Sequence, residues 1–193
     1  MSQPMRYLIG TAVGGAVAAV GFTWLRSGAL TLDVGIGRTV LPLGPISLHI
    51  HAPREVVFDI IAQPYLGRTP RAMSAKLRVL ERGTDMVLAE HFTPTSAGRV
   101  STTVETVRFE APHRVSFRLV RGPVPHVTEA FELESVDDGT VLRYAGELGT
   151  DFWGLGRAWG TRVAKVWEAA VQTSLDSIRT EAERRSTDNP VPK

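Results

Sequence analysis

Residues 152–185 read FWGLGRAWGTRVAKVWEAAVQTSLDSIRTEAERR, and this stretch decides the fold. Apolar residues recur in it at helical spacing, and charged or amide side chains occupy the other side. The apolar stripe comprises Trp159, Val163, Val166, Ala170, Ser174 and Ile178, widened by Trp167, Val171, Leu175 and Ala182. The pattern predicts one amphipathic helix of about 30 residues, much longer than the usual 11 or 12.

The chain before this helix predicts a sheet. Six strand-like runs are separated by turn signals: KLRVLER (76–82), MVLAEHFT (86–93), RVSTTVETVRF (99–109), RVSFRLVRG (114–122), HVTEAFELESV (126–136) and TVLRYAGEL (140–148). The last two are joined by Asp-Asp-Gly, a hairpin turn signal. Six strands at hairpin spacing predict an antiparallel meander.

Upstream of the meander, ISLHIHAP (46–53) predicts a strand, and REVVFDIIA (54–62) predicts a short helix that Pro64 ends. Residues 26–45 are rich in glycine and predict a connector with one short strand near 30–36. We expect four segments along the chain: a hydrophobic segment at 1–26, a linker at 27–45, a folded domain at 46–185 and a disordered tail at 186–193.

The composition of the 193-residue chain, 43% hydrophobic and 22% charged, is typical of a folded protein. A net charge of +2 indicates no nucleic-acid face, so we expect no nucleic-acid partner. The absence of cysteine excludes disulfides and thiolate chemistry. Neither a serine elbow nor a phosphate-cradling glycine loop is present, so a hydrolase triad or an NTPase is not supported.

Residues 7–25, YLIGTAVGGAVAAVGFTWL, carry no charge and lie between Arg6 and Arg26. As a helix they would rise about 28 Å, close to the roughly 30 Å of bilayer hydrocarbon. We therefore expect one transmembrane helix that anchors the domain, with the cytoplasm as the expected side. The alternatives are a signal peptide that is cleaved and a helix that is buried or lies at the membrane interface.

Gly10 and Gly14 have the spacing at which small residues let two membrane helices approach. Self-association through these two glycines is one interpretation. The other is that glycine and alanine are simply abundant in this segment.

Three segments carry a resemblance to a known family: HIHAPREVVFDII (49–61), FEAPHRVSFRLV (109–120) and FELESVDDGTVLRY (131–144). Together with the element order, they resemble the SRPBCC superfamily, which includes START lipid-transfer domains and polyketide cyclase-like proteins. YLGRTP (65–70) and RGPVPHV (121–127) resemble a membrane-tethered actinobacterial branch. The resemblance implies an α+β helix-grip fold, in which about seven antiparallel strands curve around the long helix and leave a hydrophobic cavity.

The implied cavity suits a hydrophobic small molecule or a lipid. Strand alternation places Leu133 and Leu142 on its concave wall. The residues expected to bind the ligand are Phe117, Leu119, Glu129, Phe131, Tyr144, Trp159, Val163 and Trp167. The gap after the short helix is the expected pocket mouth, where Tyr65, Arg68 and Arg71 either hold an anionic head group or lie in solvent. The alternative for the whole set is a closed core without a cavity.

Glu129 is the one weak catalytic candidate, because strand parity directs its carboxylate into an apolar enclosure that would raise its pKa. Glu105 has a similar but weaker position. His49 and His51 have a spacing compatible with metal ligands, but no third ligand is identified in the sequence, so we expect no metal and no cofactor.

Three functions remain open. The first is a membrane-tethered binding module for a hydrophobic or lipid-like molecule. The second is a polyketide cyclase-like enzyme that uses an inward carboxylate as acid or base, and the third is a ligand-free accessory subunit of a membrane complex.

Overall fold

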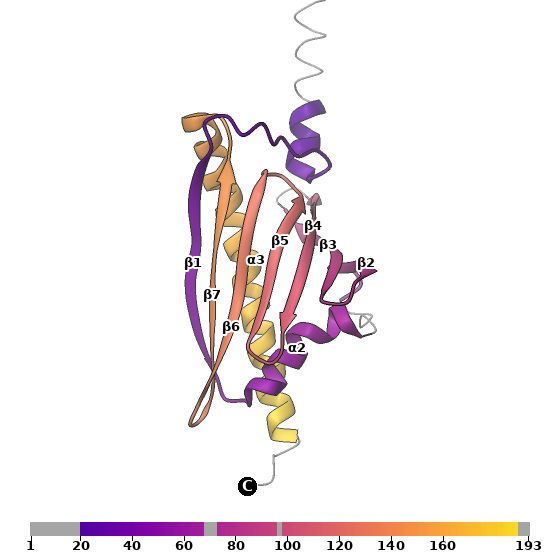
Figure 1. Ribbon diagram of the computed structural model, residues 1–193, viewed down its shortest axis with the longest axis vertical. Coiled ribbons are helices and arrows are strands. Elements are labelled where there is room, and N and C mark those ends of the chain that lie inside the picture. Colours follow the sequence, from indigo (N-terminus) through magenta and orange to yellow (C-terminus); the bar gives the residue numbers. More distant parts are fainter. Residues whose placement is uncertain (1–19, 68–72, 96–97, 189–193) are drawn as a thin grey trace, which may run out of the picture.

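The computed structural model describes residues 20–67, 73–95 and 98–188. Its elements follow one another as β1 (Thr39–Ile50), α2 (Arg54–Leu66), β2 (Leu77–Arg82), β3 (Met86–Pro94), β4 (Val100–Glu110), β5 (Arg114–Arg121), β6 (His126–Val136), β7 (Gly139–Thr150) and α3 (Trp153–Asp188). The strands form one seven-stranded sheet in the order β1-β7-β6-β5-β4-β3-β2, with every pair antiparallel. The long helix α3 lies across one face of this curved sheet, and α2 packs beside it (Figure 1). The predicted α+β helix-grip architecture is confirmed.

β1 differs from its prediction at both ends. It begins at Thr39, inside the segment predicted as a connector, and ends at Ile50. The strand runs through Gly44-Pro45 because its register shifts between Leu43 and Ile46. Gly44 has a φ of +76°, which a side chain disfavours, and an added Cβ would lie 3.0 Å from the Tyr144 carbonyl oxygen. The proline turn that appeared to end the connector is therefore a bulge within a strand.

The prediction of a short strand near residues 30–36 is wrong. These residues have no ladder partner and cross the end of the sheet as an extended connector. Thr31 Oγ1 donates a hydrogen bond to the Gly122 carbonyl at 2.7 Å, and Asp151 holds the following residues. Side-chain anchors replace strand pairing here.

α2 continues past the proline that was expected to end it. Pro64 lies inside the helix, which closes at Gly67 with a hydrogen bond from the Gly67 amide to the Gln63 carbonyl at 2.9 Å. The last turn persists because Tyr65 packs into the core, and because Arg82 donates to the Tyr65 and Gly67 carbonyls at 2.9 Å each. These contacts stabilise the last turn by more than the missing backbone hydrogen bond of Pro64 costs.

The apolar stripe of α3 is narrower than predicted. Its buried residues are Gly160, Val163, Val171, Leu175 and Ala182. Trp159, Trp167 and Ile178 are partly buried against the core, whereas Val166 and Ser174 are exposed. The helix therefore buries a stripe centred on Val163, Val171 and Leu175, and residues 186–188 of the predicted tail are still helical.

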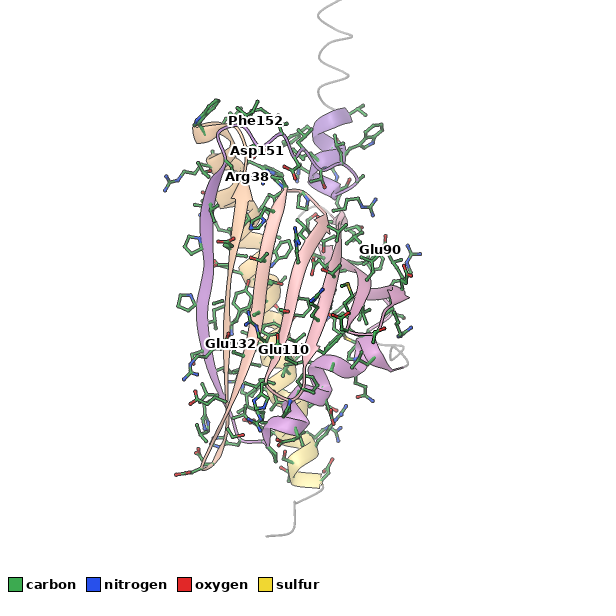
Figure 2. The ribbon with its side chains drawn as sticks, in the orientation of Figure 1. Arg38, Glu90, Glu110, Glu132, Asp151 and Phe152 are labelled. Atoms are coloured by element: carbon green, nitrogen blue, oxygen red, sulfur yellow. The ribbon has the colours of Figure 1, made fainter. Side chains whose placement is uncertain are left out.

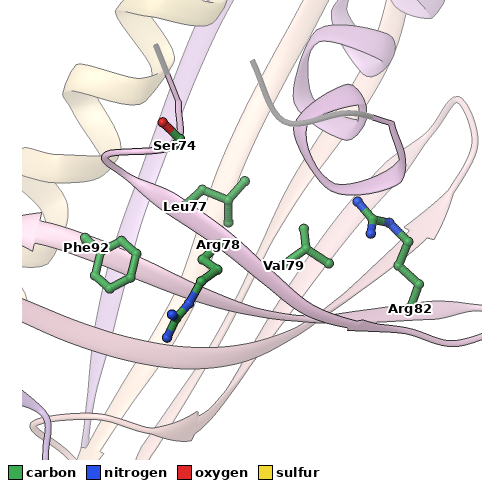
Figure 3. Close-up of a pocket in the computed structure, with 6 residues that line it drawn as sticks. All are labelled: Ser74, Leu77, Arg78, Val79, Arg82 and Phe92. Atoms are coloured by element: carbon green, nitrogen blue, oxygen red, sulfur yellow. The ribbon is translucent and has the colours of Figure 1, made fainter. Parts of the chain in front are cut away.

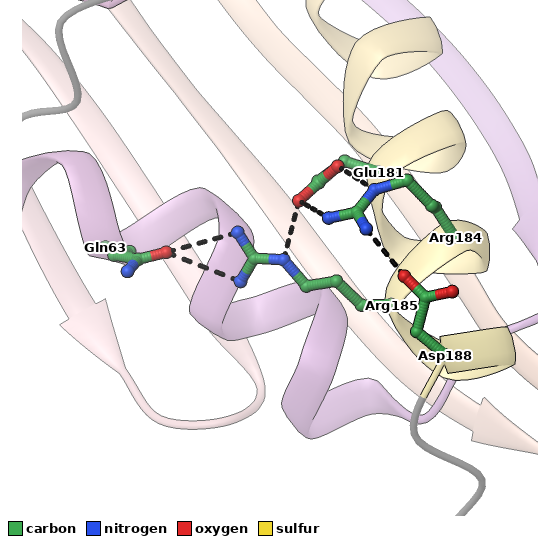
Figure 4. A network of polar contacts seen from close by, with 5 residues as sticks. All are labelled: Gln63, Glu181, Arg184, Arg185 and Asp188. Atoms are coloured by element: carbon green, nitrogen blue, oxygen red, sulfur yellow. Dashed lines mark hydrogen bonds and ion pairs between the residues drawn. The ribbon is translucent and has the colours of Figure 1, made fainter.

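A polar network fastens the end of α3 to α2 (Figure 4). Arg185 Nε donates to Glu181 at 2.7 Å, and the same guanidinium reaches Gln63 Oε1 at 3.4 Å. Arg184 bonds to Glu181 and to Asp188. Both arginines thus pair with acidic side chains of α3, and Arg185 also connects α3 to α2.

The predicted transmembrane segment falls mostly outside the described residues. Residues 20–27 are helical and are joined to the domain by the connector described above. Within the described ranges, no helix combines the length and the apolarity that crossing a bilayer requires.

Asp151 joins the connector to the turn that precedes α3 (Figure 2). Its carboxylate accepts hydrogen bonds from the amides of Val34 and Gly35 at 2.7 and 2.8 Å, and from Arg38 Nε at 2.8 Å. The bonds from Arg38 and the amides outweigh the cost of burial and lower the pKa of Asp151 to about 2. Asp151 therefore stays ionised and holds the connector across the end of the sheet.

Replacing Asp151 with alanine would leave Arg38 and two amides without their acceptor. We expect Asp151→Ala to lower the free energy of unfolding by about 3 kcal/mol, measured by chemical denaturation. The folded pKa lies below the usual value, so the stabilisation is present at neutral pH and is lost as the pH falls through about 2.

Asp85→Ala is the matched control, because Asp85 makes an exposed ion pair with Arg108 at 3.6 Å. Its removal should cost less than about 1 kcal/mol. Equal losses in the two variants would contradict the role assigned to Asp151.

Candidate functional site

The strand register brings the candidate residues onto the face that α3 covers. Phe131 is paired with Tyr144 across β6 and β7, and Phe117 is paired with Glu129 across β5 and β6. Leu119 continues the same face to Glu105 on β4. Because side chains alternate along each strand, these residues form adjoining rows on the sheet beneath the helix.

Glu129 is held from two sides. Its Oε2 accepts a hydrogen bond from the Tyr144 hydroxyl at 2.6 Å and another from Trp167 Nε1 of α3 at 2.7 Å. Tyr144 is fully buried, while Glu129 itself retains some accessible surface. The carboxylate therefore links β6, β7 and α3.

No cation pairs directly with Glu129 among the described residues, and its ionisation reflects that. Burial, followed by repulsion from Glu105, raises the pKa of Glu129 to about 7 from the ordinary 4.5. The hydrogen bonds from Tyr144 and Trp167 oppose this rise without cancelling it. Near neutral pH Glu129 therefore occurs in both its protonated and its ionised form.

A second polar group lies further along the same face. His91 Nδ1 is 3.2 Å from Glu105 Oε2, and Thr103 Oγ1 donates to Glu105 Oε1 at 2.5 Å. The Tyr65 hydroxyl, from α2, is 2.9 Å from His91 Nε2. Three elements, α2, β3 and β4, thus contribute the histidine–carboxylate pair and its hydrogen-bond partners.

The two partners of this pair stabilise each other's charge. Burial disfavours the imidazolium, but Glu105 outweighs it and the pKa of His91 is raised. Burial likewise acts against the carboxylate, but His91 and Thr103 outweigh it and the pKa of Glu105 is lowered. The pKa of the Tyr65 phenol is raised by its burial, so it remains protonated.

Aromatic rings connect the two polar groups. The ring centroids of Phe117 and Phe131 are 5.6 Å apart, and those of Phe131 and Tyr144 are also 5.6 Å apart. At the other end, Phe117 lies 6.1 Å from Tyr65 and 6.3 Å from His91. The arrangement is a row of aromatic rings, the aromatic floor, with the Glu129 carboxyl group at one end and the His91–Glu105 pair at the other, and we call it the interior site.

Most of the residues expected to bind a ligand adjoin this site. Glu129, Tyr144 and Trp167 are directly hydrogen-bonded, and Phe117 and Phe131 form the floor. Leu119 and Val163 are buried nearby in the same core, together with Leu133 and Leu142. Trp159 is further along α3, where its Nε1 donates to the Pro123 carbonyl at 2.8 Å.

The sequence analysis missed His91 as a member of the site. The sequence contained a usable signal, because His91 has the same strand parity as Val87 and Ala89, which are both buried. Tyr65, the hydrogen-bond partner of His91, was expected at the pocket mouth. It is instead buried against the His91 ring. Arg68 and Arg71, the other two residues of the expected mouth, lie outside the described residues.

A groove of about 540 Å³ lies on the edge of the sheet, lined by Ser74, Leu77, Arg78, Val79, Arg82 and Phe92 (Figure 3). Its two arginines are already engaged. Arg78 pairs with the buried Glu90, and Arg82 caps the end of α2. Because its charged groups serve the fold, this groove is a weaker candidate than the interior site.

His49 and His51 do find a third group in the folded chain. Asp138, from the β6–β7 turn, lies 3.0 Å from His49 Nε2 and 3.8 Å from His51 Nδ1. All three residues are exposed, and the aspartate already pairs with both rings. The contact explains the cluster as a link between β1 and the hairpin.

Comparisons with known proteins agree with this fold. The Zhui aromatase/cyclase from Streptomyces sp. R1128 superposes with a TM-score of 0.62 at 17% identity, over 77% of this chain and 95% of that one. The di-domain ARO/CYC StfQ of the steffimycin pathway gives 0.62 at 14% identity, over 78% of this chain and 52% of its own. A START superfamily protein from Mycobacterium smegmatis superposes with a TM-score of 0.51 at 11% identity, over 75% of this chain and 97% of that one. These identities bear on the fold alone.

Among curated proteins, no sequence matches this chain significantly. The resemblance to the SRPBCC superfamily is confirmed, whereas the membrane-tethered actinobacterial branch stays a prediction. A family described as "Polyketide cyclase / dehydrase and lipid transport" matches residues 46–183. With that match over more than half of its length, the chain belongs to the polyketide cyclase/dehydrase and lipid transport family.

Proposed function

We propose that this protein binds a hydrophobic small molecule between the sheet and α3, with a polar group of the ligand hydrogen-bonded to Glu129. The observation that carries this proposal is the carboxyl group of Glu129, which is enclosed by aromatic side chains and has no cation beside it among the described residues. Such a group costs stability in a core. A hydrogen bond to a hydroxyl or carbonyl group of a ligand would account for the presence of this carboxyl group.

The aromatic floor defines the kind of ligand. Phe117 and Phe131 offer flat apolar surfaces that suit a ring system or a lipid tail. The protonated form of Glu129 donates to a carbonyl, and its ionised form accepts from a hydroxyl. Family membership supports the same class of ligand, since lipid transport and polyketide chemistry both concern apolar molecules.

Membrane tethering belongs to this proposal. Residues 7–25 carry no charge, and a ligand that partitions into lipid is most concentrated beside a bilayer. An anchor at that segment would keep the interior site next to its source of ligand.

Removing the carboxyl group should weaken binding. We expect Glu129→Ala to bind 1,8-dihydroxyanthraquinone, a planar probe with hydroxyl and carbonyl groups, about tenfold more weakly than the native chain. Fluorescence titration of the full chain measures this. Trp167→Phe, which removes one partner of Glu129, should show a smaller loss.

Glu132→Ala is the matched control, because Glu132 lies on the same strand but points to the exposed face (Figure 2). It should bind the probe as the native chain does. If the two variants bind equally well, or if the native chain binds neither the probe nor any co-purifying molecule by native mass spectrometry, the accessory-subunit alternative is favoured.

The raised pKa of Glu129 also predicts how stability depends on pH. Its folded pKa of about 7 is above the ordinary 4.5, so the contribution of Glu129 to stability is greatest below pH 4.5 and is lost as the pH rises to 7. We expect the difference in unfolding free energy between native chain and Glu129→Gln to change by about 1.4 kcal/mol per pH unit in this window. A pH-independent difference would contradict the assignment.

Proton transfer is a second candidate function, favoured by the same pKa. A carboxylate that titrates near neutral pH is suited to remove a proton beside a ligand carbonyl and to return it. Glu129 would take the proton from the carbon beside the carbonyl, which leaves an enolate, and would then return the proton to that carbon.

Exchange of hydrogen for deuterium tests this second function. In heavy water the full chain should accelerate exchange of the methyl protons of 2-acetylnaphthalene, followed by NMR, with a rate that rises through pH 7. Glu129→Gln should abolish the acceleration and Glu132→Gln should keep it. Without acceleration by the native chain, binding alone remains as the proposal.

A further inference from the structure

Exposed apolar side chains gather at one end of the molecule. Of the seventeen large hydrophobic side chains exposed in the described part of the chain, ten belong to residues 20–36 and 152–155. We call these two segments the apolar end. They include Trp24, Trp153 and Leu155, with exposures of 56%, 62% and 80%. A soluble surface rarely collects such residues without a partner.

The two segments are fixed side by side. The amides of Phe152 and Trp153 donate to the carbonyls of Ile36 and Gly37, at 2.8 Å each. The Phe22 ring contacts Trp159 of α3 at a centroid distance of 5.8 Å. Residues 20–27 and the first turn of α3 accordingly lie at the same end of the ribbon (Figure 1). The apolar end is one continuous feature of the tertiary structure.

The backbone is strained where the exposed rings are displayed. Phe152 and Trp153 have φ values of 71° and 48°, a region that bulky residues avoid. Asp151 and the connector hold this turn in place. Glycine would adopt this backbone conformation without strain, so two exposed aromatic residues in this turn point to a use for their exposure.

The charges around this end suit a lipid surface. Asp33 and Asp151 both pair with Arg38, so one of the two acidic charges at this end is balanced there. Arg157 and Arg162 are exposed on the following turns of α3 and make no ion pair within the described ranges. Unpaired cations next to exposed tryptophan and leucine are typical of a surface that contacts anionic head groups.

We infer that the apolar end of this domain, with Trp153 and Leu155 at its tip, inserts into the head-group region of a bilayer. The uncharged segment 7–25 enters the described chain at this same end, through Val20, and so brings it to the lipid. This inference rests on the membrane tethering proposed above but not on the ligand. It orients the domain with the start of α3 at the lipid and the β6–β7 hairpin away from it.

The absence of cysteine in the native chain makes a direct test possible. The full chain carrying Leu155→Cys is labelled with the environment-sensitive fluorophore NBD and reconstituted into phosphatidylcholine/phosphatidylglycerol vesicles. We expect its emission to shift to shorter wavelength and to rise severalfold, and to be quenched by lipids that carry a spin label near the head group. The control is Ser135→Cys, an exposed position by the β6–β7 hairpin, whose label should behave as in water.

Vesicle flotation separates this inference from the tether. If the chain floats with the vesicles while the Leu155 label stays in water, the docking surface is refuted and the tether stands. If the chain does not float, both are refuted. A shift that appears without lipid and grows with protein concentration would instead assign the apolar end to a second copy of the chain, and would also overturn the inference.

Discussion

Burial of the α3 stripe against one face of the sheet is the interaction on which the rest of the structure depends. Val163, Val171 and Leu175 are covered only because the strands curve around the helix. The helix packs mainly against β1, β7 and α2, and α2 also packs against β2, β3, β5 and β6, so the inward side chains of the sheet lie in a layer beneath the two helices together. That layer is both the core of the domain and the place where the candidate site is assembled.

The polar groups in this layer are treated in two different ways. His91 and Glu105 compensate each other, so their burial as charges is tolerated. Glu129 has two hydrogen-bond donors but no counter-charge beside it, and its pKa is raised accordingly. The first arrangement compensates two buried charges, and the second leaves a carboxyl group whose protonation changes near neutral pH.

The two ends of the domain have different surfaces. The end near Gln63 and Arg185 is closed by ion pairs within α3 and a hydrogen bond from Arg185 to α2, whereas the end near Asp151 displays aromatic and aliphatic side chains. Asp151 connects the interior to that apolar end, since it fixes both the connector and the turn from which α3 starts. A hydrophobic ligand that leaves a bilayer would meet the apolar end first.

The sequence by itself determined the meander, the long helix and the inward rows of Phe117, Glu129, Phe131 and Tyr144, because strand and helix periodicity are local properties. It missed the path of β1 through Gly44-Pro45 and the continuation of α2 past Pro64, where tertiary contacts outweigh local signals. Only the tertiary structure decided that Trp167 and Tyr144 share the Glu129 carboxylate, that His91 meets Glu105, and that residues 20–36 lie beside the start of α3. Those contacts join side chains far apart in the chain, so they depend on strand register and helix placement.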